Sequence, residues 1–151
     1  MKKRWLALVG VLTLALMPHF GSAQSIGTAQ GSKPGKLQQN YPNPFNPETS
    51  ARFAIGDSPA CAEGSKQYRV SIRIYNILSQ LVAVPTMQGS AGNVVGGVTP
   101  LENVQLPCGE YVWYWNGNYK GTSQEAASGV YLAVLEVDGK RVSVVRMLNN
   151  K

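Results

Sequence analysis

The protein has 151 residues, of which 44% are hydrophobic and 15% are charged, and it contains 16 glycines and 9 prolines. This length is typical of one domain, and the hydrophobic share excludes disorder throughout the chain. The low charge together with many helix-breaking residues excludes a coiled coil or a long helical bundle.

The first 23 residues predict a secretory signal peptide. Residues 2–4 are basic, residues 5–17 are almost uniformly apolar, and residues 21–23 are small enough to suit cleavage after Ala23. The apolar run is shorter than the roughly 20 residues that a membrane-spanning helix needs. An uncleaved anchor helix is the alternative, whereas cleavage would leave a chain with no stable membrane span.

Cleavage would also remove the only histidine, His19, and lower the net charge. Losing three of the 14 basic residues and none of the eight acidic ones leaves +3. The remaining basic residues are scattered, so we expect no nucleic-acid partner. Without histidine, the mature chain has no Ser-His-Asp or Cys-His catalytic site and no histidine metal site. We expect a non-enzymatic protein with no metal and no cofactor, since an enzyme here would have to work without histidine.

Cys61 and Cys108 are the only cysteines. A signal peptide leads to an oxidising compartment, where two cysteines are expected to form a disulfide. A pair of free, reactive thiols is the alternative.

The mature chain opens with a polar, glycine-containing segment, 24–36, which we expect to be a flexible linker. Residues 37–47 (LQQNYPNPFNP) follow, and their prolines and asparagines predict a rigid, irregular ribbon because proline fixes φ and lacks a backbone donor. We expect Tyr41 and Phe45 to anchor it to the core. A proline-rich ligand for a partner's groove is the alternative.

The rest of the chain has the short alternating patterns of strands, separated by turn signals and without a convincing helix. Residues 129–137 are apolar on both faces and are expected to be a central strand. Residues 86–107 are expected to be a long, irregular connection. The predicted strands are 50–55, 68–75, 80–84, a weak edge strand near Val94, 109–115, 129–137 and 140–148. About seven such strands predict an all-β antiparallel sandwich.

Two sets of side chains within these strands have alternative interpretations. Tyr111, Trp113 and Trp115 alternate along one strand and either pack in the core or form a platform for carbohydrate. Arg69 and Arg73 are expected to lie on a solvated strand face.

Four segments together carry a resemblance to a known family. They are LQQNYPNPFNPETSARFAI from residue 37, VSIRIYNILSQLV from residue 70, Trp115–Asn116–Gly117, and SGVYLAVLEVDGKRVSVVRML from residue 128. Residues 37–151 thereby resemble the type A C-terminal sorting domain of type IX secretion substrates. They are also similar to the Ig-like domain of the flagellar hook-capping protein, although flagellar export substrates are not expected to carry such a signal peptide.

The resemblance implies an Ig-like antiparallel sandwich that acts as an address. A signal peptide would deliver the chain to the periplasm, and outer-membrane translocon proteins would then recognise the folded domain and export it to the cell surface or the medium. The residues that the resemblance assigns to sorting are Asn43, Pro44, Phe45, Asn46, Pro47, Gly129, Val130, Tyr131, Lys140, Arg141, Val144, Val145, Arg146 and Met147.

A second hypothesis is a small structural or adhesive module that is itself the exported product. Members of the family normally carry this domain behind a large cargo, whereas only residues 24–36 would precede it here. The two cysteines and the 86–107 connection are also additions to a bare address. Such a module would bind a cell-surface partner or assemble with itself.

Overall fold

The computed structural model describes residues 33–89 and 99–151, which form an all-β domain. The expected signal peptide, residues 24–32 of the expected linker and the strand expected near Val94 lie outside these residues. The strands are β1 (Gly35–Leu37), β2 (Thr49–Ile55), β3 (Gln67–Asn76), β4 (Leu81–Ala83), β5 (Thr86–Gln88), β6 (Val104–Pro107), β7 (Gly109–Trp115), β8 (Gly129–Val137) and β9 (Lys140–Asn149). The two described ranges contain no helix able to cross a membrane.

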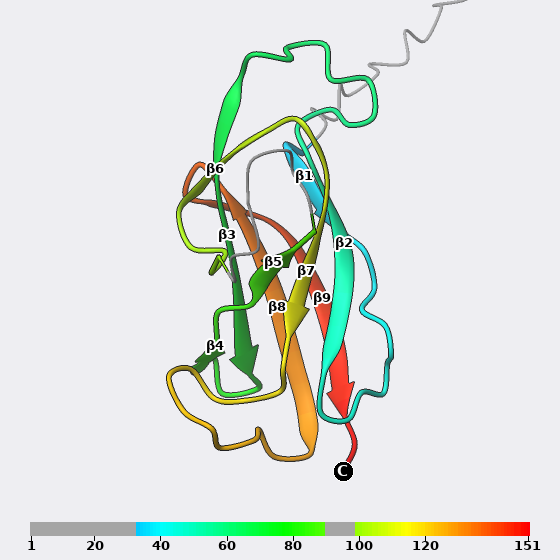
Figure 1. The fold of residues 1–151 in the computed structure, drawn as a ribbon, viewed down its shortest axis with the longest axis vertical. Helices are drawn as coiled ribbons and strands as arrows, with labels where there is room; N and C mark the ends of the chain where they lie inside the picture. The colour runs from blue at the N-terminus through cyan, green and yellow to red at the C-terminus, as the bar shows by residue number, and fades with distance from the viewer. Residues whose placement is uncertain (1–32, 90–98) are drawn as a thin grey trace, which may run out of the picture. The chain divides into compact units, whose positions relative to one another are not determined.

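The strands form two antiparallel sheets packed face to face (Figure 1). One sheet has the order β1-β2-β7-β5, and the other has the order β4-β3-β8-β9 with β6 paired to β3. The predicted antiparallel sandwich is therefore confirmed, with more strands than the seven or so expected. The central position of β8, between β3 and β9, is also confirmed.

Alternating side chains of the long strands fill the space between the sheets. Val70, Ile72 and Ile74 of β3 are completely buried, as the alternation predicts. Arg73, on the opposite face of β3, is half-buried because it pairs with Glu136 of β8. The fully solvated face expected for Arg73 is therefore wrong.

The aromatic row of β7 belongs to the core. Trp113 and Trp115 are 0% and 2% exposed, so the interpretation as a carbohydrate platform is wrong. Tyr111 is half-buried, and its ring centroid lies 5.4 Å from that of Phe53 on β2. Burial of large rings between the sheets is the main stabilising contribution expected of such a row.

Two segments expected to be irregular contain short strands. β1 begins at Gly35, inside the expected linker, because its backbone pairs with the end of β2 (Gly35 with Ile55). The 86–107 segment supplies β5, which pairs with β7, and β6, which pairs with β3. Strands of three or four residues show too little alternation to stand out in a sequence.

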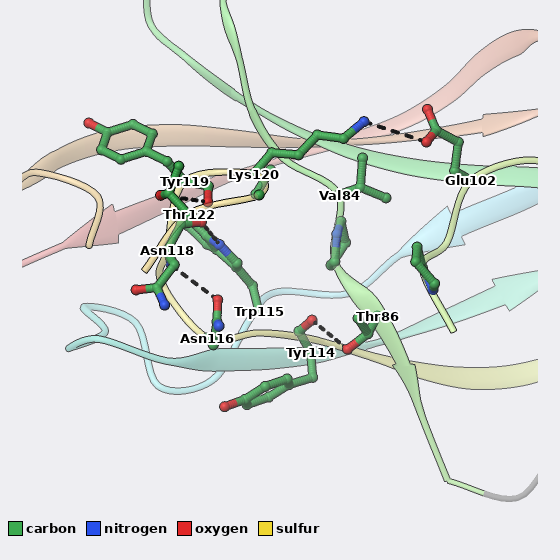
Figure 2. A pocket seen from close by; sticks show the side chains of 14 residues that line it. Val84, Thr86, Glu102, Tyr114, Trp115, Asn116, Asn118, Tyr119, Lys120 and Thr122 are labelled. Atoms are coloured by element: carbon green, nitrogen blue, oxygen red, sulfur yellow. Dashed lines mark hydrogen bonds and ion pairs between the residues drawn. The ribbon is translucent and has the colours of Figure 1, made fainter. Parts of the chain in front are cut away.

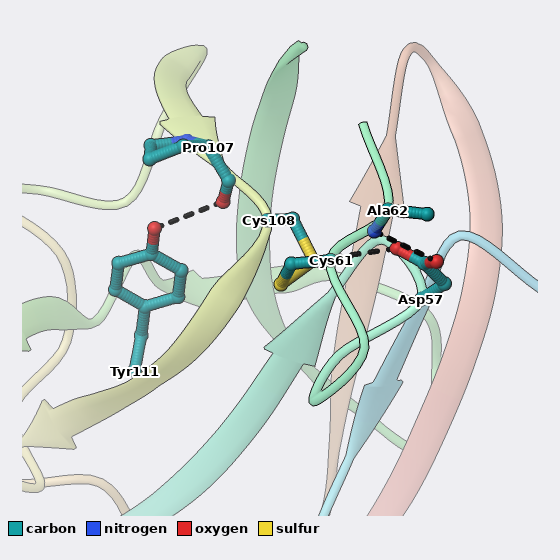
Figure 3. The surroundings of a disulfide bond; sticks show 6 residues. All are labelled: Asp57, Cys61, Ala62, Pro107, Cys108 and Tyr111. Atoms are coloured by element: carbon teal, nitrogen blue, oxygen red, sulfur yellow. Dashed lines mark hydrogen bonds between the residues drawn. A yellow bond between two sulfur atoms is a disulfide. The ribbon is translucent and has the colours of Figure 1, made fainter. Parts of the chain in front are cut away.

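Cys61 and Cys108 form the predicted disulfide, so the alternative of free thiols is wrong (Figure 3). The bond ties the β2–β3 loop to the residue between β6 and β7. Asp57 Oδ2 accepts a hydrogen bond from the backbone N of Ala62 at 3.2 Å, and its Oδ1 contacts Cys108 Sγ at 3.5 Å. The sulfur contact is not a hydrogen bond, since a disulfide sulfur carries no proton. Because the two sulfurs are bonded to each other, they are also not thiolates, which is the form of cysteine that binds a metal.

Candidate functional site

The proline-rich segment is held in shape by its own polar side chains. Asn40 is 3% exposed, and its Nδ2 donates to Pro42 O and to Thr49 Oγ1, both at 2.9 Å. The Thr49 hydroxyl donates in turn to Pro42 O at 3.0 Å. Because the prolines offer no backbone N–H, side chains supply the donors that a strand would have provided.

The last five residues of the proline-rich segment, 43–47, lie against the end of β9 (Figure 1). From here on, the ribbon means these five residues. The backbone N of Phe45 donates to Leu148 O at 2.9 Å, and the backbone N of Asn150 donates to Phe45 O at 3.0 Å. Leu148 N donates to Asn43 Oδ1 at 3.0 Å. The ribbon therefore covers the last part of the outer edge of β9, as a short parallel strand would.

An aromatic cluster fixes the ribbon to both sheets. Phe45 is 1% exposed, and its ring centroid lies 5.3 Å from that of Trp115 on β7. The ring of Trp115 in turn meets that of Tyr131 on β8 edge-on at 5.4 Å. Expectation and structure differ for Tyr41, which is 82% exposed and does not anchor the core.

The tight turn after β7 completes this cluster. Trp115 Nε1 donates to Asn118 O at 2.9 Å. Gly117 has a φ of +80°, and a Cβ placed there would lie 2.1 Å from Pro47 O. Only glycine tolerates both this conformation and this approach of the backbone. The Trp–Asn–Gly element and the ribbon, which are far apart in sequence, are therefore in direct contact.

The residues assigned to sorting divide into a buried and an exposed set. Phe45, Tyr131 and Met147 are 1%, 4% and 0% exposed, so no partner touches their side chains in the folded domain. Pro47, Gly129, Val130 and Val145 are half-buried. The exposed members are Asn43, Pro44, Asn46, Lys140, Arg141, Val144 and Arg146.

Only part of the exposed set is brought together. Asn43, Pro44 and Arg146 line a shallow pocket of about 280 Å³ with Val130 and Leu148. The remaining basic residues of β9 are Lys140 and Arg141. Lys140 lies six residues before Arg146 and is thus roughly 20 Å away along the strand. We call the exposed outer side of β9, with the ribbon, the recognition surface.

The basic side chains on this surface have different electrostatic surroundings. Arg141 Nε lies 3.7 Å from Glu136 Oε1, and its guanidinium lies over the ring of Tyr75. Lys140 and Arg146 have no ion-pair partner in the part of the chain that the structure describes. Their positive charges are therefore available to an acidic partner.

Burial also changes the acidity of the tyrosine beneath the ribbon. Burial raises the pKa of Tyr131 to about 12, and its hydroxyl donates to Ala127 O at 2.7 Å. This tyrosine is neutral at physiological pH and serves the packing of the cluster.

Sequence analysis missed three residues that build this surface. Gln39 Nε2 donates to Arg146 O at 3.0 Å. Asn149 is 2% exposed, and its Nδ2 donates to the carbonyls of Ala126 and Ala127. The steric role of Gly117 was also missed. A glycine directly after Trp–Asn indicated a turn, but no sequence signal shows which segment packs against it.

A second pocket, of about 350 Å³, lies at the β4–β5 connection and the loop after β7 (Figure 2). Figure 2 shows Lys120 reaching toward Glu102 across it, with Nζ 3.6 Å from Oε2. The indole of Trp115 borders this pocket but is almost fully buried. None of the residues assigned to sorting lines it.

Comparison with known proteins adds no relative to these observations. No protein-family model, no curated protein and no solved structure matches the chain. The assignment of a function therefore depends on the geometry of the recognition surface and on the resemblance of its motifs.

Proposed function

We propose that this protein is a secreted, non-enzymatic sorting domain, recognised by outer-membrane translocon proteins of the type IX kind. One observation carries the proposal. The ribbon and β9, about 100 residues apart in sequence, form one exposed surface. It carries the cation of Arg146, which has no ion-pair partner among residues 33–89 and 99–151. The resemblance to the sorting family points to these two segments as the recognition elements.

The construction of this surface suits an address that is read only after folding. Phe45, Trp115 and Tyr131 place the ribbon on β9, so the surface exists only when both sheets are assembled. A receptor that binds it would therefore discriminate folded from unfolded chains in the periplasm. Burial of the aromatic cluster supplies the energy that holds the surface together.

The direct test is export of the full chain in a bacterium that possesses this machinery. The charge reversal Arg146→Glu alters the recognition surface, and Arg52→Glu makes the same substitution at an exposed position of β2, in the other sheet. We expect the wild type and the Arg52 variant at the cell surface or in the medium. The Arg146 variant is expected to stay in the periplasm, folded and oxidised.

Two results would contradict the proposal. One is wild-type protein held in the periplasm, and the other is equal export of both variants. Intact mass of the exported protein, with and without reductant, then shows whether the C-terminal strand is retained and the two thiols are oxidised.

A small structural or adhesive module that is itself the exported product is the second candidate. The 350 Å³ pocket between Glu102 and Lys120 favours it, because an address needs no ligand pocket. This candidate requires the uncut protein to persist at the surface and to bind a surface component or a second copy. The same mass measurement distinguishes the two.

A further inference from the structure

The outer edge of β9 is only partly covered. On this edge Leu148 bonds to the ribbon through both its N–H and its C=O, and Arg146 O accepts from Gln39 Nε2. In an antiparallel pair, every second residue directs its backbone groups away from the partner strand. Val144 lies two residues before Arg146 on β9 and pairs with Val134 of β8. By this alternation, the N–H and C=O of Val144 point to the same outer side as those of Arg146 and Leu148.

These outward groups are open to an added strand. Among residues 33–89 and 99–151, no backbone or side-chain group bonds to the N–H or C=O of Val144 on this side, or to the N–H of Arg146. The Val144 side chain is 53% exposed. We call residues 142–146 the open edge. An edge strand of this kind is a template for pairing with an extended segment of another chain.

A second copy of this chain is a poor occupant of the open edge. Antiparallel pairing of two β9 strands about Val144 would set residue 140 of one copy opposite residue 148 of the other. Leu148 is already bonded to the ribbon, so that position is blocked. In the same register Arg146 of one copy would stand opposite Val142 of the other, next to its Arg141, and like charges close together across strands are destabilising.

The same charges select a partner of opposite sign. Arg146 lies on the outer face two residues after Val144, and the basic pair at 140 and 141 lies on the other side of it. Side chains on one face recur every two residues. The residue two before Val144 is the buried Val142, where the β8–β9 register shifts by one residue. Because of this shift, Arg141 pairs with a β8 residue only two positions from the partner of Val144, so it flanks Val144 on one side as Arg146 does on the other. A strand opposite Val144 would therefore gain from acidic residues two positions before and after its central residue, and from an apolar central residue.

We propose that the open edge binds one extended strand of a partner protein, with acidic side chains on both sides of an apolar residue that lies opposite Val144. This inference names the partner chemistry of the recognition surface and so rests on the proposed function. Backbone hydrogen bonds would give affinity, and the flanking charges would give selectivity and register.

The test uses the isotope-labelled mature chain, residues 24–151, and end-capped peptides followed by NMR. The acidic probe has Glu-Thr-Val-Thr-Glu at its centre. Its matched controls are the same peptide N-methylated along its backbone, and a peptide with Lys in place of Glu. We expect the acidic probe alone to shift the amide signals of Val144 and Arg146 and to slow their hydrogen exchange.

Variants of the chain separate edge pairing from general charge attraction. Val144→Pro removes an N–H that β8 does not use, and proline is tolerated on an edge strand when its nitrogen faces outward. We expect it to weaken binding of the acidic probe about tenfold. Arg52→Glu, on the other sheet, should bind as the wild type does. The double variant, with Lys140→Glu and Arg146→Glu together, should bind the lysine probe more tightly than the acidic probe. This comparison still decides the inference if the proline variant does not fold.

Three results would overturn the inference: no shift at the open edge with the acidic probe, equal binding by folded Val144→Pro, or unchanged binding of the N-methylated probe. Failure of the inference is distinct from failure of the proposed function. If the probes fail while Arg146→Glu still blocks export, only the edge pairing is wrong. If the probe binds while Arg146→Glu and Val144→Pro are both exported, the sorting role is wrong.

Discussion

Replacing Phe45 by alanine tests whether one ring holds the ribbon on β9. Phe45 is 1% exposed and contacts Trp115, and removal of such a buried ring from a protein core typically costs about 3–5 kcal/mol. We expect a loss of about 3 kcal/mol in unfolding free energy, at the lower end of this range. The ribbon is a surface loop and can move partly into the space that the ring leaves.

Urea unfolding of the oxidised protein gives the free-energy change, and native-state hydrogen exchange locates it. The amides of Leu148 and Asn150 donate to the ribbon, so they should lose protection in Phe45→Ala while the amides between β8 and β9 keep it. Tyr41→Ala is the matched control. Tyr41 is 82% exposed, and its loss should change stability by about 0.5 kcal/mol or less. Equal effects of the two variants, or unchanged exchange at Leu148, would refute the anchoring role of Phe45.

Three further predictions concern stability. Replacing Cys61 and Cys108 together by alanine should lower the unfolding free energy by about 4 kcal/mol, because the bond spans 47 residues of the unfolded chain; a loss below about 1 kcal/mol in urea unfolding would contradict this. Gly117→Ala should destabilise by about 3 kcal/mol or more through its positive φ and its clash with the ribbon, whereas Gly121→Ala, at a φ of +72° with no atom within 4 Å, should cost only about 1–2 kcal/mol. The folded pKa of Tyr131 is raised to about 12, above the ordinary value near 10. Its stabilising contribution should therefore be complete below about pH 10 and disappear as the pH rises through about 12. Thermal unfolding across this pH range should show a smaller decline in stability for Tyr131→Phe than for the wild type.

The strand pattern of the long elements was readable from the sequence because apolar and polar residues alternate along them. In β3, the apolar Val70, Ile72 and Ile74 fill the core, which gives a clear period of two. The polar Ser71 and Arg73 lie on the other face, where Ser71 is buried as well and its hydroxyl accepts a hydrogen bond from the backbone N of Asn103. β1, β5 and β6 were missed because three or four residues show no clear period. Their strand conformation comes from the neighbours with which they pair. β4 is equally short, but the turn residues before it and Pro85 after it marked its ends.

The recognition surface was only partly predictable. The motifs named its residues, but they did not separate the buried anchors Phe45, Tyr131 and Met147 from the exposed Arg146. A proline-rich segment has no period from which burial can be predicted, so Tyr41 and Phe45 looked equivalent. Only their positions in the fold distinguish them.

The sequence by itself determined the class of this protein. Apolar alternation, turn residues and two cysteines specify an antiparallel sandwich with a disulfide, because each is a local property of the chain or a pairing with one possible partner. The tertiary structure decided which distant segments meet. Contact between Gly117 and Pro47, and hydrogen bonds from the ribbon to Leu148, join parts of the chain about 70 and 100 residues apart. Such contacts depend on the order of strands in the sheets, which no local pattern encodes.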